Sequence, residues 1–153
     1  MNSLLLEAKQ KRKFVSPDLQ IQSWEDVKPY FDQLVSFNID SETAMKNFLA
    51  FRSELEAVLS EEMSWRYIKM TCDTTNDSLR ESFNTFVTEI DPEISKYSNV
   101  LDKKCLENPY FQNLDGDYLI MKRALRQREA LFREENVPLI AELQTMEQDY
   151  GNI

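Results

Sequence analysis

The longest uninterrupted helical pattern in the chain runs from Ser41 to Asp73 and contains no Gly or Pro. Apolar residues recur there at the i, i+3, i+4, i+7 spacing of an α-helix, and this face comprises Met45, Phe48, Leu49, Leu55, Leu59, Met63, Tyr67 and Met70. A second apolar stripe beside it comprises Phe51, Val58, Trp65 and Cys72. Because the two stripes leave only a narrow polar strip, we expect a central helix with neighbours on most of its surface. A helix of about thirty residues spans roughly 45 Å, which is enough to cross the whole domain.

Three further helical patterns surround this central one. Ser23 followed by acidic residues predicts a helix start, and that helix should end near Phe37. A third helix is expected from about Asp77 to Leu106, kinked at Pro92, because its apolar residues keep the same phase on both sides of the proline. A fourth is expected from Asp117 to Gly151 as one helix that passes through Pro138.

The connections between these helices are short, which favours antiparallel packing of successive helices. The longest irregular stretch is expected at Glu107 to Gly116, with Phe111 tucked under the helix ends. The sequence therefore predicts an all-α fold: a single domain over residues 1–153, built as an antiparallel up-and-down bundle of about four long helices, some kinked at proline.

Composition supports a soluble helical domain and narrows its partners. The chain has 153 residues, of which 42% are hydrophobic, with only 2 Gly and 5 Pro. The net charge of -9 would repel nucleic-acid phosphates and anionic lipid, so neither nucleic acid nor a membrane is an expected partner. Leu4 to Leu6 is too short for a signal-peptide core, and no run approaches membrane-spanning length, so we expect a cytoplasmic protein. Cys72 and Cys105 lie in apolar stripes and are expected to act as small core residues.

The chain contains no histidine, which limits the chemistry that it can perform alone. An H-E-x-x-H zinc site, a Glu-x-x-His di-iron site and any nucleophile driven by an imidazole are all excluded. We therefore predict no catalytic and no metal-binding residue in this chain. Pairs of carboxylates are weak evidence for catalysis, although a hydrolase that uses carboxylates alone stays open as a third alternative.

Four residues of the central helix are candidates for structural or interface roles: Arg52, Trp65, Arg66 and Tyr67. The two arginines fall on the apolar face, where a guanidinium needs a carboxylate partner, and Glu62 lies one turn before Arg66. Interhelical ion pairs are favoured over contact with a ligand. Trp65 and Tyr67 are expected to be core or interface anchors.

The last helical pattern carries a basic run: Lys122, Arg123, Arg126, Arg128 and Arg133. These residues point in several directions around the helix, and Glu129 precedes Arg133 by four residues. A salt-bridged, solvated face is therefore a better interpretation than a track for phosphates.

Several segments, taken in order, resemble the N-terminal helical region of the oligoendopeptidase F family, which is related to thimet oligopeptidase. The segments are Arg52–Val58, Trp65–Thr74 and Leu131–Leu139, with shorter similarities at Arg12–Phe14, Ser23–Glu25 and Glu142–Thr145. The resemblance implies the non-catalytic N-terminal helical part of a zinc metalloendopeptidase that cleaves oligopeptides, with these helices forming a wall or lid of the substrate channel.

The resemblance also implies what lies outside this sequence. The family's catalytic half, with H-E-x-x-H and a downstream Glu, would follow Ile153, and zinc would belong to that half alone. Its partners would be the catalytic half and the oligopeptide substrate of the whole enzyme. An isolated chain should expose an apolar surface and self-associate through it as concentration rises. The alternative is a stand-alone helical protein-interaction module that docks a partner helix in an apolar groove.

Overall fold

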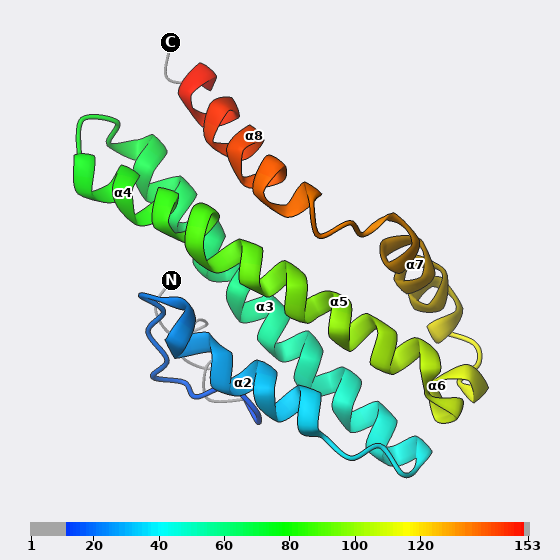
Figure 1. Ribbon diagram of the computed structural model, residues 1–153. Coiled ribbons are helices and arrows are strands. Elements are labelled where there is room, and N and C mark those ends of the chain that lie inside the picture. Colours follow the sequence, from blue (N-terminus) through cyan, green and yellow to red (C-terminus); the bar gives the residue numbers. More distant parts are fainter. Residues whose placement is uncertain (1–11, 152–153) are drawn as a thin grey trace.

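The computed structural model describes residues 12–151, and all regular structure within these residues is helical (Figure 1). Leu4 to Leu6 lie outside the described residues. The helices are α2 (Trp24–Ser36), α3 (Glu42–Cys72), α4 (Asp77–Thr85), the π-helical turn η1 (Phe86–Ile90), α5 (Asp91–Glu107), α6 (Pro109–Asn113), α7 (Tyr118–Leu131) and α8 (Asn136–Gly151).

Local side chains define where the first helices begin. The Asp26 carboxylate accepts the backbone N–H groups of Gln22 and Ser23, each at 2.9 Å, at the start of α2. The Ser41 hydroxyl accepts the N–H of Ala44 at 3.1 Å at the start of α3. These three bonds satisfy backbone donors that have no partner within the helix, so α2 and α3 begin where the sequence predicted.

Helix α3 runs along the length of the molecule, with α2 and the continuous α4–η1–α5 segment beside it (Figure 1). Helix α7 contacts α5, and α8 contacts both η1 and α5. The main core lies between α2, α3, η1 and α5, where the largest fully buried side chains gather. They include Phe31, Phe48, Phe86, Leu55 and Ile90. The central position of α3 thus agrees with its two apolar stripes.

The helical segment from Asp77 to Glu107 is unbroken, as the apolar phase predicted, but it contains a π-helical turn immediately before Asp91. Pro92 occupies the first turn of α5. A proline has no N–H to donate to the carbonyl one turn earlier, and the wider π-turn accommodates this missing bond.

The prediction of one continuous fourth helix is wrong. Helix α7 ends at Leu131 and α8 begins at Asn136, with Phe132 in an extended conformation. Pro138 lies in the first turn of α8, where its missing N–H would be unpaired in any case. The Arg133 guanidinium donates to the carbonyls of Ala130 and Phe132 and so satisfies the end of α7.

The stretch Glu107 to Gly116 is also less irregular than expected, because α6 forms within it. The Asn108 side chain accepts the N–H of Tyr110 at 2.9 Å and so begins this short helix. Phe111 on α6 is fully buried, which confirms the prediction that it packs under the helix ends. Gly116 has a φ of 64°, a left-handed conformation that favours glycine, and it makes the turn into α7.

Candidate functional site

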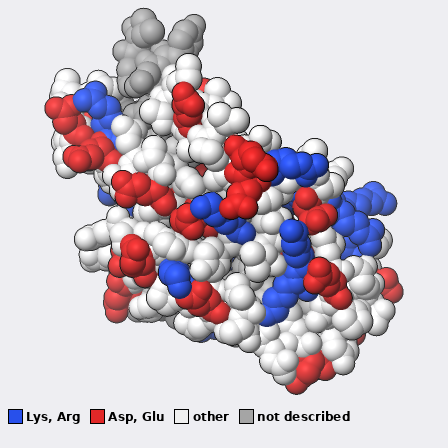
Figure 2. Space-filling view, viewed as in Figure 1, with Lys and Arg blue, Asp and Glu red and all other residues white. Residues whose placement is uncertain are grey.

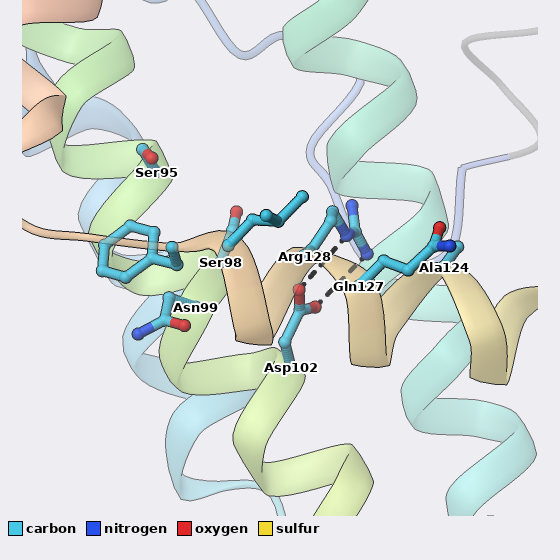
Figure 3. Close-up of a pocket in the computed structure, with 9 residues that line it drawn as sticks. Ser95, Ser98, Asn99, Asp102, Ala124, Gln127 and Arg128 are labelled. Atoms are coloured by element: carbon cyan, nitrogen blue, oxygen red, sulfur yellow. Dashed lines mark hydrogen bonds and ion pairs between the residues drawn. The ribbon is translucent and has the colours of Figure 1, made fainter.

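A cluster of charged residues joins α3, α5 and α7. The Asp102 carboxylate on α5 is 3% exposed and lies between two guanidiniums. Its Oδ1 accepts from Arg52 Nη2 of α3 at 2.5 Å. Arg128 Nε of α7 lies 3.2 Å from Oδ2 (Figure 3). Arg52 Nε also donates to Glu56 at 2.7 Å. We call these four residues the Asp102 cluster.

The energetics of the Asp102 cluster are those of buried charge. The side chains of Arg52 and Asp102 are almost completely buried, whereas that of Arg128 is 56% exposed. Burial disfavours the charge on Arg52, but the carboxylates of Glu56 and Asp102 outweigh it and raise the pKa of the guanidinium. Removing Asp102 would leave the buried Arg52 with only Glu56 as a partner, so the pair of Arg52 and Asp102 stabilises the contact between α3 and α5.

The interhelical ion pair predicted for Arg52 is thus present, and its partner is Asp102. Sequence reasoning missed Asp102, and it placed Arg128 in the basic run without this partner. The sequence did contain a signal for Asp102: it lies next to Leu101 and one turn before Cys105, two apolar residues that are buried. An acid at such a position needs a cation from a neighbouring helix.

A pocket of about 480 Å³ opens beside the cluster, between α5 and α7 (Figure 3). Helix α5 contributes the hydroxyls of Ser95 and Ser98 and the amide of Asn99, and Leu131 and Phe132 supply apolar lining. Asp102 and Arg128 also line it, but each already binds the other. The lining offers hydrogen-bonding groups, and its one carboxylate is held by two guanidiniums, so this pocket is suited to binding and not to proton transfer.

Arg66 is a second anchor, of a different kind. Its Nη1 donates to the carbonyl and hydroxyl of Ser82 on α4 at 3.0 and 2.7 Å, and its Nη2 donates to the carbonyl of Ile21. The predicted partner Glu62 lies 3.8 Å away on the same helix. The guanidinium also lies over the Phe86 ring, 5.4 Å from its centroid. Arg66 therefore ties α4 and the segment before α2 to α3 mainly through neutral oxygens.

Trp65 and Tyr67 lie at the surface of α3, 42% and 53% exposed, and neighbouring Ile68 is exposed as well. They are not core residues, so the prediction that they could be core anchors is wrong. The Tyr67 ring contacts Phe83 of α4 with 5.9 Å between centroids. The helical pattern could not show this exposure, because beyond Met63 the neighbours of α3 cover fewer of its faces. Their role as interface anchors stays a prediction.

The basic run is exposed as expected, except at Lys122. Lys122 is buried, lies near the Phe111 ring and donates to the carbonyls of Gln112, at 2.7 Å, and Leu114. Arg133 binds backbone carbonyls in place of the expected Glu129. Several of these cations therefore satisfy groups within the protein.

The two cysteines differ in environment. Cys105 is buried, and this burial raises its pKa to about 11, although nearby Arg52 acts in the opposite direction. It is the small core residue that was predicted. Cys72 is exposed at the end of α3, so the same prediction is wrong for it. Cys72 lies in an apolar stripe, but this stripe does not predict its burial because the helix ends at this residue.

Among the side chains that the structure describes, no group of three or more Cys, Asp or Glu is arranged to hold a metal ion. None of the helices within residues 12–151 is both long and apolar enough to cross a membrane. The fold and the site together define an all-helical structural unit whose buried charges hold its helices together.

Comparison with known families agrees with this class. The family model described as "Peptidase M3 N-terminal domain" matches residues 14–121, which is more than half of the chain. The chain therefore belongs to the Peptidase M3 N-terminal domain family. The match includes α2 to α6, the Asp102 carboxylate and the start of α7, whereas α8 lies beyond it. Neither the curated proteins nor the solved structures gave a match to this chain.

Proposed function

We propose that this chain is the non-catalytic N-terminal helical part of an M3-type, oligoendopeptidase F-like zinc metalloendopeptidase of the cytoplasm. In this proposal residues 1–153 form one antiparallel helical bundle that is a wall or lid of the substrate channel. The zinc, the H-E-x-x-H motif and the catalytic carboxylate belong to a separate catalytic half, and the oligopeptide is the substrate of the two parts together.

The family match over residues 14–121 is the observation that carries the proposal. The absence of histidine supports the non-catalytic role, because an M3-type zinc site needs imidazole ligands. The exposed apolar side chains of Trp65, Tyr67 and Ile68 near the end of α3 support a contact with another protein part. Exposed aromatic side chains are common anchors of interfaces.

The test combines the chain with an M3-type catalytic half that lacks its own N-terminal region. We expect the two parts to co-purify and the mixture to cleave a fluorogenic oligopeptide in the presence of zinc. The helical chain alone should show no turnover with or without zinc. Trp65→Asp should weaken co-purification, whereas Val100→Asp, a matched change at an exposed apolar position of α5, should not.

Two results would overturn the proposal. One is stoichiometric zinc binding together with peptide cleavage by the helical chain alone. The other is a catalytic half that neither binds this chain nor changes its activity when the chain is added.

The alternative function is a stand-alone helical interaction module. The exposed apolar side chains of α8, such as Leu139 and Leu143, favour it because they resemble a docking surface. Reading the source gene beyond Ile153 separates the two proposals, since only the peptidase proposal requires H-E-x-x-H downstream.

A further inference from the structure

Helix α8 exposes its larger apolar residues, whereas an ordinary surface helix buries them. Its small apolar residues Val137 and Ala141 face the rest of the chain and are buried. Its larger ones are 52% to 61% exposed, and they are Leu139, Ile140, Leu143 and Met146. Residues 139, 143 and 146 follow the i, i+4, i+7 spacing, so they form one continuous apolar stripe on the outer face.

Helix α7 carries a second exposed apolar set. Leu119, Ile120 and Leu131 are 50%, 79% and 77% exposed. Ile120 and Leu131 are eleven residues apart, about three turns, so they lie on the same face of the helix. A monomeric protein rarely exposes this much aliphatic surface on two successive helices, so a covering partner is expected.

The charges beside the two sets are of opposite sign. Arg123 and Arg126 on α7 are exposed, and Arg123 is next to Ile120 on the helix surface. Glu142 and Glu147 on α8 are exposed and flank the stripe, and the α8 sequence contains no Lys or Arg. Figure 2 shows blue side chains gathered at the edge formed by α7, whereas white and red surface covers α8.

We propose that two copies of this chain associate about a two-fold axis, with α7 of each copy packed against α8 of the other. The α7 and α8 surfaces lie on the same chain, so a two-fold axis creates two equal α7–α8 contacts. These two contacts close the assembly as a dimer. Leu139, Leu143 and Met146 would cover the aliphatic residues of the other copy's α7. Arg123 and Arg126 would face the other copy's Glu142 and Glu147. The proposal is independent of the proposed function.

The first test measures the mass of the isolated chain by light scattering and sedimentation from about 1 to about 300 µM. We expect a monomer–dimer equilibrium. Leu139→Glu with Leu143→Glu should raise the dissociation constant at least about a hundredfold. Ile68→Glu is the matched control at an exposed aliphatic position of α3 and should leave it unchanged.

The second test uses two charge-reversed chains. The first carries Arg123→Glu with Arg126→Glu, so its α7 and α8 are both acidic. The second carries Glu142→Lys with Glu147→Lys, so both of its helices are basic. Neither chain should form a homodimer, but a mixture of the two should form a heterodimer, because each α7 then meets an α8 of opposite charge. Far-UV circular dichroism confirms that both variants are folded.

A wild-type chain that stays monomeric at the highest concentration would overturn the proposal. So would a wild-type dimer that both charge-reversed chains retain, because it would use another surface. Failure to form the heterodimer would overturn the α7–α8 pairing. These measurements use the helical chain alone, so their failure is separate from a failure of the proposed function.

Discussion

Substitution of Asp102 by Asn is the sharpest probe of how this helical fold is held together. The substitution preserves the shape of the side chain and removes its negative charge. Arg52 would stay buried and keep one ion-pair partner, Glu56, whose side chain is 45% exposed. Arg128 would lose its partner but is 56% exposed, so water can solvate it.

The expected loss of stability follows from this difference in burial between Arg52 and Arg128. Removing one partner of a buried ion pair costs about 3–5 kcal/mol, and we expect the lower end, about 3 kcal/mol, because Glu56 remains with Arg52. Arg128→Gln, which removes only the exposed arm, should cost about 1 kcal/mol or less. For a chain of this size, a loss of about 3 kcal/mol lowers the midpoint of thermal unfolding by roughly 6–12 °C.

The assay is urea unfolding at pH 7, followed by far-UV circular dichroism, at a concentration where the chain is monomeric. Asp102→Leu combined with Arg52→Met should cost less than Asp102→Asn alone, because the pair then disappears without leaving a charge behind. The reasoning is refuted if Asp102→Asn lowers the free energy of unfolding no more than Arg128→Gln does.

Three further predictions concern other parts of the fold. The Glu54 carboxylate is partly desolvated, yet its bonds from the backbone N–H groups of residues 13–15 lower its pKa below 4.5. Its stabilisation is therefore complete above pH 4.5 and is lost as pH falls through the lowered pKa, so Glu54→Gln should cost about 2 kcal/mol in urea unfolding at pH 7 and less at pH 3. Cys72 should react quickly with a thiol reagent, and buried Cys105 only on unfolding; equal rates at pH 8 would contradict this. Phe111→Ala should cost about 3–5 kcal/mol by differential scanning calorimetry, whereas a cost below about 1 kcal/mol would show that α6 is not part of the core.

The sequence by itself determined where most of the helices lie. The central helix was expected from Ser41 to Asp73 and spans Glu42–Cys72. Apolar periodicity and capping residues are local properties, so they can be read without knowledge of the neighbours. The histidine count likewise excluded an autonomous M3-type zinc site, because composition limits chemistry in any fold.

Tertiary structure decided which faces of those helices are covered. Trp65 and Tyr67 share stripes with buried residues of α3 but are exposed, because periodicity shows that a face is apolar and not that a neighbour reaches it. The pairing of Arg52 with Asp102, 50 residues away, depends on how α5 lies against α3. The apolar residues keep one helical phase across the break between α7 and α8, so the sequence pattern does not show this break. Its position depends on how the two helices pack against α5 and η1.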